Sequence, residues 1–295
     1  MFGRLMTAMV TPFDHQNELD LANLAPLVEH LIQSGTTALV VCGTTGESPT
    51  LSHDEKLALF AEVVRLCAGR IPVIAGTGSN STKDSVQLTK EAEELRVDGF
   101  LLVAPYYNRP SQDGLYQHFL TVAKSTHKPI ILYNIPSRTG VNLQPDTIVR
   151  LAEQANIVGV KESTGDFTQI AHLIAKTPHD FLVYSGDDKF TLPIMAMGGS
   201  GVVSVASHLV GLRMSEMIEA VQHGDLPRAQ SIHYELLPLF EELFRTSNPV
   251  LVKAALSMID IPVGRVRSPL FDATSEEKRS LRRVLEKVLD LDRVH

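Results

Sequence analysis

Lys161 is the residue whose type and position first suggest chemistry. It follows the short apolar run 157–160 (IVGV), which is typical of a strand buried on both faces. Removing an amine from water disfavours its charged form, so a lysine at the end of such a run is either paired or reactive. The adjacent Glu162 is a possible ion-pair partner, and the stretch IVGVKEST alone leaves both interpretations open.

Other side chains that could do chemistry also follow short apolar runs. The stretches are GTTGES at 43–48, PYYNRP at 105–110, YNIPSRTG at 133–140 and SGDD at 185–188. Thr44 and Thr45 could offer hydroxyls and backbone N–H groups to a carboxylate, although such a stretch also suits an ordinary turn. Tyr133 and Tyr107 could be acid–base phenols or packed aromatics. Arg138 could bind a carboxylate through two hydrogen bonds or be solvated.

The elements that must position these side chains form an alternating pattern. Eight apolar runs are candidate strands: 5–10, 38–42, 72–75, 100–104, 130–133, 157–161, 181–185 and 202–205. Amphipathic stretches with the helical period separate them. Eight such units in about 220 residues predict an α/β fold, a (β/α)8 TIM barrel, over 1–224. The rest of the chain is helical in pattern and predicts a C-terminal helical region over 225–295.

The barrel gives Lys161 a catalytic position. In (β/α)8 barrels the active site lies at the carboxyl ends of the strands, where the βα loops gather. Lys161 ends the sixth candidate strand, and the four polar stretches end others. The reactive interpretation of Lys161 is therefore favoured over the paired one.

Composition and charge exclude several classes of partner. The 295 residues carry a formal charge of -7 without long runs of one sign, which gives no basic stripe for nucleic acid or for a membrane surface. No run of about 18 apolar residues predicts a transmembrane helix, and the first residues do not resemble a secretory signal. Two cysteines make no disulfide framework, which fits a cytoplasmic location.

No metal or organic cofactor is predicted. The sequence has no HExxH motif and no Walker loop, and GTGSNS at 76–81 lacks the third glycine of a dinucleotide fingerprint. The eleven histidines show no ligand spacing. Asp187 and Asp188 could suggest a metal, but we interpret this pair as solvated loop acids.

Several long motifs together resemble one family. GTTGES, APYYNRPSQDGLYQHF, YNIPSRTG, GVKESTGD and SGDD, in this order and spacing, are similar to the dihydrodipicolinate synthases (4-hydroxy-tetrahydrodipicolinate synthases) of lysine biosynthesis. The resemblance runs from about Leu5 to the SNPVLVKAAL stretch at 247–256. It implies an enzyme that condenses pyruvate with L-aspartate 4-semialdehyde through a lysine Schiff base, without a cofactor.

The resemblance also implies roles for individual residues. Lys161 corresponds to the nucleophile that attacks C2 of pyruvate. Tyr133 corresponds to the phenol that transfers protons beside the imine, linked through the Thr44 hydroxyl to Tyr107. In the family, the second tyrosine reaches in from a neighbouring subunit, and the usual assembly is a homotetramer built as a dimer of dimers.

Substrate-binding roles follow in the same way. Thr45, with Thr44, resembles the site for the pyruvate carboxylate, and Arg138 resembles the residue that binds the semialdehyde carboxylate. Gly186 and Val203 match positions that line the pocket near the lysine.

Two alternatives to this function are considered. Sister pyruvate-dependent aldolases, the N-acetylneuraminate lyases and the 2-keto-3-deoxy sugar acid aldolases, share the barrel and the lysine. The Thr44–Thr45 pair and Arg138 favour the synthase. A non-catalytic binding or regulatory barrel is the other alternative, and the intact set of polar residues argues against it.

A possible effector site is also implied by the resemblance. Many family members bind lysine in a cleft between subunits, and four residues resemble parts of that site: Ser48, His53, Asn80 and Tyr106. Pro49, Lys56 and Asp84 depart from its best-known form, and Lys56 brings a positive charge towards a cationic effector. We expect weak or absent inhibition by lysine.

Overall fold

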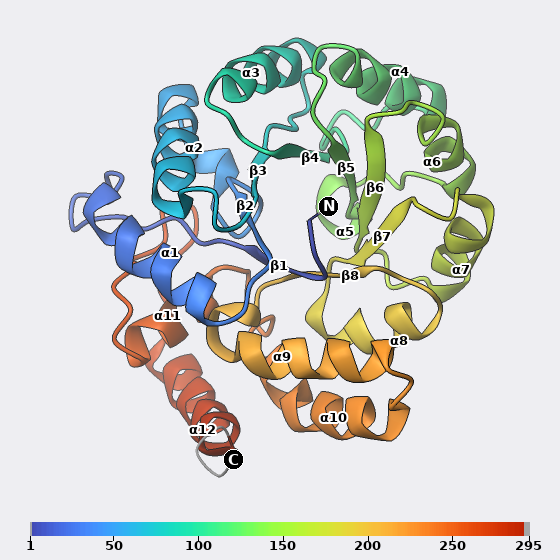
Figure 1. Cartoon of the computed structure of the whole chain (residues 1–295). Coiled ribbons are helices and arrows are strands. Elements are labelled where there is room, and N and C mark those ends of the chain that lie inside the picture. The colour runs from blue at the N-terminus through green and yellow to red at the C-terminus, as the bar shows by residue number, and fades with distance from the viewer. Residues whose placement is uncertain (1, 292–295) are drawn as a thin grey trace.

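Eight parallel strands close into a barrel in a computed structural model that describes residues 2–291 (Figure 1). Each strand pairs with its neighbours along the chain, and β8 pairs with β1. The strands are β1 Leu5–Ala8, β2 Ala38–Val41, β3 Val73–Gly76, β4 Gly99–Val103, β5 Ile130–Asn134, β6 Ile157–Glu162, β7 Leu182–Ser185 and β8 Gly201–Ser204. The predicted (β/α)8 barrel is confirmed.

Each strand lies where an apolar run predicted one, with ends that differ by at most two residues. The largest functional difference concerns β6, which continues through Lys161 to Glu162. Because side chains alternate along a strand, consecutive residues of β6 face opposite sides of the barrel wall.

The apolar core has two parts. One fills the barrel interior and includes Met6, Ile131, Tyr133, Tyr184 and Val203. The other lies between the strands and the surrounding helices, which explains why the strands are apolar on both faces.

Helices connect the strands and form the outer ring. They are α1 Leu24–Gln33, α2 His53–Cys67, α3 Thr82–Glu94, α4 Gln112–Ala123, α6 Pro145–Leu151, α7 Phe167–Lys176, α8 Thr191–Ala196 and α9 Ser207–Gln222. The connections after β2, β5 and β7 contain shorter helical segments: η2 Ser48–Thr50, α5 Pro136–Thr139 and η3 Asp188–Phe190. A further short segment, η1 Leu21–Asn23, precedes α1.

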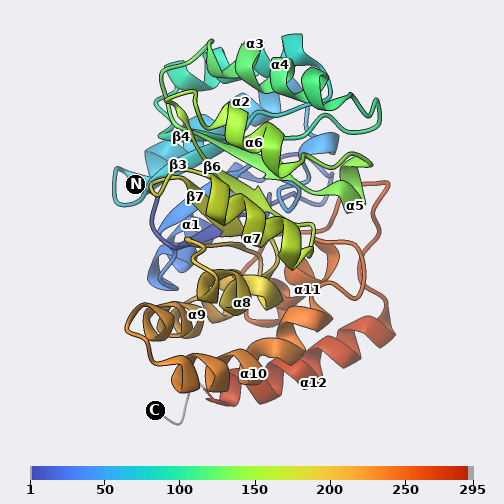
Figure 2. The ribbon, with the colours of Figure 1, turned by 90° about the vertical axis from the view of Figure 1, so that its right-hand side faces the viewer.

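Three helices follow the barrel: α10 Leu226–Glu242, α11 Val250–Met258 and α12 Ser275–Leu291. Helix α10 packs on α9 and α12, and α11 contacts both α9 and α12 (Figure 2). The predicted helical extension is therefore present, while its separation from the barrel at residue 224 stays a prediction. Figure 2 also places the N-terminus and α5 at opposite ends of the barrel.

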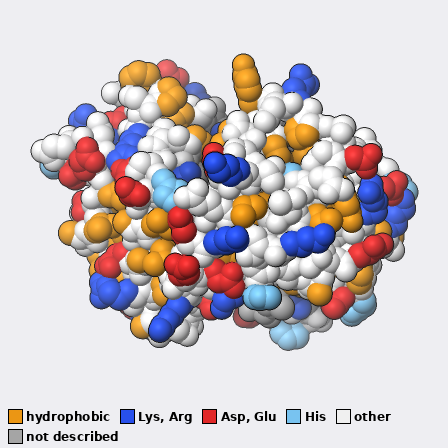
Figure 3. All heavy atoms as spheres, turned by 90° about the horizontal axis from the view of Figure 1, so that it is seen from above, with side chains coloured by type: hydrophobic (Ala, Val, Ile, Leu, Met, Phe, Trp, Pro, Cys, Tyr) orange, Lys and Arg blue, Asp and Glu red, His pale blue; other side chains and the backbone are white. Residues whose placement is uncertain are grey.

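Acidic and basic side chains are mixed over the face above α3 and α4, without a large area of one sign (Figure 3). Within residues 2–291, no helix combines the length and the apolar character that a membrane span requires.

Candidate active site

Lys161 lies at the carboxyl end of β6 with only 5 % of its surface exposed. The parallel register pairs it with Tyr133 on β5 and with Tyr184 on β7. Its Nζ lies 4.3 Å from the centroid of the Tyr133 ring. The Tyr184 hydroxyl instead donates to the Gly3 carbonyl at 3.0 Å, so this phenol is turned away towards the amino-terminal end of the barrel. Tyr133 is therefore the phenol that accompanies the lysine.

The paired interpretation of Lys161 is wrong. The Glu162 carboxylate accepts hydrogen bonds from Asn134 Nδ2 at 3.1 Å and from the Thr164 N–H at 2.8 Å, on the other side of the barrel wall. Burial raises the pKa of Glu162. None of the ion pairs within residues 2–291 involves Lys161.

Gly186, directly after β7, leaves space for the Lys161 side chain. A Cβ at this position would lie 3.0 Å from Lys161 Cε and 1.9 Å from Ser163 Oγ. Ser163 is two residues beyond Lys161 on the same face of the chain, and its buried hydroxyl has no hydrogen-bond partner in the described structure. Gly186 thus lies beside the lysine, and Val203 is buried in the barrel interior with Tyr133, but neither is among the residues that line the cavity beside Tyr133. Their assignment to the pocket stays a prediction.

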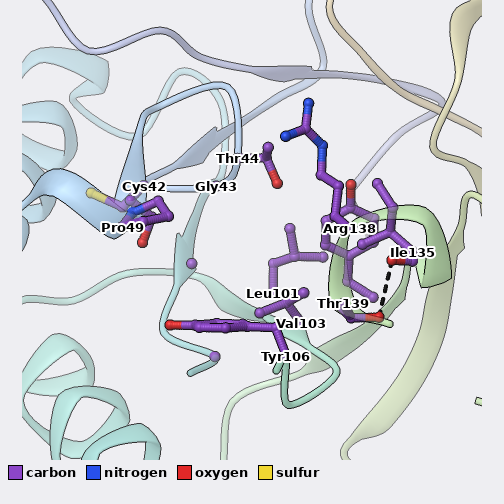
Figure 4. Close-up of a pocket in the computed structure, with 14 residues that line it drawn as sticks. Cys42, Gly43, Thr44, Pro49, Leu101, Val103, Tyr106, Ile135, Arg138 and Thr139 are labelled. Atoms are coloured by element: carbon purple, nitrogen blue, oxygen red, sulfur yellow. Dashed lines mark hydrogen bonds between the residues drawn. The ribbon is translucent and has the colours of Figure 1, made fainter. Parts of the chain in front are cut away.

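Tyr133 is one of the residues that line a cavity of about 260 Å³. It is lined by Thr44 from the β2 loop, Tyr106 from the β4 loop and Arg138 from α5, among others. Figure 4 shows the Arg138 side chain extending along the cavity in the direction of Thr44. Lys161 is not one of the lining residues, but it contacts Tyr133, which is. The structure thus brings five of the predicted catalytic, substrate-binding and effector residues to one cavity, and Lys161 to its border.

The loop after β2 presents backbone donors. The N–H groups of Thr44 and Thr45 donate to no acceptor within residues 2–291. The Thr45 side chain is buried, and its Oγ1 accepts a hydrogen bond from Asn248 Nδ2 at 2.9 Å. Two adjacent free N–H groups suit a carboxylate, as the sequence predicts for this loop.

Tyr107 is not part of the cavity. It is 89 % exposed, and its backbone N–H donates to the Thr139 carbonyl at 3.2 Å. No hydrogen bond joins Tyr133, Thr44 and Tyr107 within the described part of a single chain. The predicted relay through these hydroxyls stays a prediction.

The four candidate effector residues divide into two pairs. Ser48 and Tyr106 line the same cavity as Thr44. His53 Nε2 is hydrogen bonded to the Glu91 carboxylate at the surface, and the Asn80 carbonyl accepts from the side chain of Asn108. Lys56, near the cavity residue Cys42, is partly buried, and burial lowers its pKa.

The interpretation of Asp188 as a solvated loop acid is wrong. Its carboxylate is buried and accepts hydrogen bonds from the Ser204 hydroxyl at 2.5 Å and from the backbone N–H groups of Val205 and Ala206. Burial raises the pKa of Asp188 to about 6 despite these donors. Asp188 therefore fixes the turn after β8. In the described range, no group of three His, Cys, Asp or Glu side chains could hold a metal ion.

Comparison with known proteins decides the family. The model of the dihydrodipicolinate synthetase family matches residues 1–288. The chain belongs to this family. A 4-hydroxy-tetrahydrodipicolinate synthase from Halalkalibacterium halodurans is 56 % identical over 279 residues, which cover 95 % of each protein.

Solved structures of the family have the same fold. A dihydrodipicolinate synthase from Bacillus anthracis is 52 % identical, covers 97 % of this chain and 98 % of its own, and superposes with a TM-score of 0.95. The synthase from Cyanidioschyzon merolae, solved with lysine bound, is 44 % identical with a TM-score of 0.96, over 97 % of this chain and 98 % of that one.

Sequence reasoning missed the contacts of the C-terminal region with the loop after β2. Asn248 contacts Thr45, and Lys253 forms a buried ion pair with Glu47 in the same loop, Nζ to Oε1 at 2.7 Å. The only signal for these residues was the resemblance of the SNPVLVKAAL stretch, which carries no distance information.

Replacing Gly186 with Ala tests the space beside Lys161. The added Cβ would displace the lysine side chain, and misplacement of a reacting group by about 1 Å can lower a rate about 100-fold. We expect Gly186→Ala to slow imine formation at Lys161 at least ~10-fold. Borohydride trapping with pyruvate as the probe, followed by intact-protein mass spectrometry, measures this rate.

The double variant Gly186→Ala/Ser163→Gly is the matched control. It removes the nearer contact of the added methyl group, and we expect it to recover part of the rate. Trapping at the wild-type rate in Gly186→Ala alone would show that this glycine does not set the position of Lys161.

Proposed function

We propose that Lys161 forms a Schiff base with pyruvate, and that the resulting enamine condenses with L-aspartate 4-semialdehyde. The activity is 4-hydroxy-tetrahydrodipicolinate synthesis, that of a Schiff-base-forming lyase in the diaminopimelate route to lysine, because the family model and the relatives named for this activity cover nearly the whole chain. One observation carries the residue assignment. Lys161 is buried beside Tyr133 at the carboxyl end of a barrel strand, with no ion-pair partner among residues 2–291.

The first half-reaction uses Lys161 and Tyr133. The amine attacks C2 of pyruvate, the carbinolamine loses water to form an imine, and removal of a C3 proton gives the enamine. We assign these proton transfers to the Tyr133 phenol, because its ring lies against Lys161 Nζ. The free N–H groups of Thr44 and Thr45 support the assignment of their loop as the site for the pyruvate carboxylate.

The second half-reaction uses Arg138. Carbon C3 of the enamine attacks the aldehyde carbon, and the amine of the semialdehyde then displaces Lys161 from C2 and closes the ring. Arg138 lines the cavity, and its guanidinium donates to no acceptor in the described part of the chain. It can therefore bind the semialdehyde carboxylate through two hydrogen bonds.

The synthase is favoured over the sister aldolases. Pyruvate and aspartate semialdehyde are both short molecules with a carboxylate. The free N–H groups of the β2 loop would bind the first carboxylate, and Arg138 would bind the second. The relatives that match over nearly the whole chain are named as synthases.

The assembly we propose is a homotetramer built as a dimer of dimers. Tyr107 supports it, because a large aromatic side chain that is 89 % exposed in one chain can complete the site of a neighbouring subunit. We also propose a cytoplasmic location, which fits the two unpaired cysteines Cys42 and Cys67.

Lysine is proposed to be a weak effector or none. Two of the candidate residues, Ser48 and Tyr106, line the catalytic cavity itself. Lys56 lies close to Cys42 on the same side and adds a positive charge. A relative solved with lysine bound shows that some members take this ligand, and Lys56 is the departure in this chain that would oppose a cationic effector through its charge.

Lys161→Ala tests the nucleophile. Treatment with pyruvate and borohydride should add one pyruvate-derived mass to the wild type and none to the variant, whose kcat should fall at least ~10³-fold. Intact-protein mass spectrometry and turnover with aspartate semialdehyde are the two measurements. An adduct on wild type without semialdehyde turnover would indicate a sister aldolase, and no adduct would return Lys161 to a structural role.

Mixed oligomers of Lys161→Ala and Tyr107→Phe test the contribution of Tyr107 from a neighbour. Tyr107→Phe alone should lower kcat about 100-fold, the scale of lost general acid–base catalysis. If the tyrosine acts across an interface, each mixed dimer has one complete site out of two. About half of the dimers in an equal mixture are mixed, so refolding or exchanging the two variants together should restore about a quarter of the wild-type activity. No recovery after proven subunit exchange would place Tyr107 in its own chain's site or outside it.

Initial rates in the presence of L-lysine test the effector proposal. We expect no inhibition at low millimolar lysine in the wild type. Lys56→Gln should increase the affinity at least ~10-fold, because like charges in a partly buried site repel by several kcal/mol. Lys124→Gln, the same change at an exposed lysine after α4, is the control. Inhibition of the wild type at micromolar lysine would contradict the proposal.

A further inference from the structure

Asn248 connects the C-terminal region to the loop that follows β2. It lies in the segment between α10 and α11 and is buried, as is Thr45. Its Nδ2 donates to Thr45 Oγ1 at 2.9 Å, across a separation of 203 residues. A buried hydrogen bond of this kind fixes the direction of both side chains.

The bond determines which way the Thr45 hydroxyl can donate. A hydroxyl has one proton and can accept through its lone pairs. Because Thr45 Oγ1 accepts from the Asn248 amide, its own proton is directed elsewhere, and it donates to no acceptor within residues 2–291. The Thr44 and Thr45 N–H groups are also free, so this loop has three donors without an acceptor among residues 2–291.

Two further contacts hold the loop in this position. Glu47 has left-handed backbone geometry, with φ of 56°, and its Oε1 pairs with Lys253 Nζ of α11 at 2.7 Å. Its Oε2 accepts from the Arg267 N–H at 2.8 Å. Both ends of the Glu47 carboxylate are thus bound by residues of the C-terminal region, and the loop cannot move away from Asn248 without breaking a buried ion pair.

We propose that Asn248 is a positioning residue for the pyruvate carboxylate, acting through Thr45. Its amide holds the Thr45 hydroxyl as a hydrogen-bond donor towards the substrate, beside the two backbone N–H groups. This inference rests on the proposed function, in which the β2 loop binds the carboxylate of pyruvate. It assigns to the C-terminal region a part in substrate recognition.

Asn248→Asp reverses the hydrogen bond with almost no change in shape. At pH 8 the introduced carboxylate accepts the Thr45 proton and places a negative charge near the substrate carboxylate. We expect the apparent KM for pyruvate to rise at least ~10-fold with a smaller change in kcat. Asn248→Ala, which only frees the hydroxyl, should give a smaller rise.

The concentration dependence of borohydride trapping, with pyruvate and with methyl pyruvate, separates positioning from general damage. Methyl pyruvate forms an imine at the same carbon, C2, but carries an uncharged ester in place of the carboxylate, so its half-saturating concentration should change less than ~3-fold in Asn248→Asp. Thr45→Val is a second variant that removes the hydroxyl without touching Asn248. Combining it with Asn248→Asp should give a smaller effect than the product of the two single changes.

Three results would overturn the inference. They are an unchanged KM for pyruvate in Asn248→Asp, an equal loss for both probes in correctly folded protein, or tighter pyruvate binding in that variant. The first would mean that Asn248 already accepts the Thr45 proton in the wild type. Absence of any adduct on the wild type would instead refute the proposed function, and the two failures are therefore distinguishable.

Discussion

The register of three neighbouring strands determines what surrounds the amine of Lys161. In a closed parallel barrel every strand is hydrogen bonded on both sides, so no strand can slip by one residue without reversing the inward and outward faces of its side chains. This constraint places Lys161 between Tyr133 and Tyr184 and turns Glu162 towards Asn134. The amine is separated from its nearest carboxylate in sequence by the barrel wall, and no ion pair within residues 2–291 involves it, as the proposed role of nucleophile requires.

A second constraint comes from outside the barrel. The buried Glu47–Lys253 pair costs desolvation of two charges, and removal of either partner from such a pair typically costs about 3–5 kcal/mol. Burial lowers the pKa of Lys253 to about 8, in spite of the carboxylate beside it. The guanidinium of Arg267 and the ammonium of Lys253 both lie over the Phe13 ring, which favours cations at this position. A barrel loop is thus shaped by the helical extension.

The fold and the central lysine could be predicted from the sequence because their signals are local. Each strand is a short apolar run, and Lys161 ends one of them. The contact of Asn248 with Thr45 could not be predicted, since nothing in either stretch encodes a meeting across 203 residues. Asp188 was misjudged for a similar reason. The groups that donate to its carboxylate lie at the end of β8, far from Asp188 in the sequence. The sequence alone therefore does not show that this carboxylate is buried.

The order in which the chain is made gives the Asn248 contact another meaning. A ribosome releases the barrel strands from the N-terminus onwards, and β6 with its lysine emerges long before the segment that holds Asn248 and Lys253. A nascent or prematurely terminated chain therefore contains Lys161 but lacks the contacts of Asn248 and Lys253 with the loop after β2. If Asn248 positions Thr45 as proposed, the loop after β2 takes its final arrangement only after the segment between α10 and α11 has been made and docked.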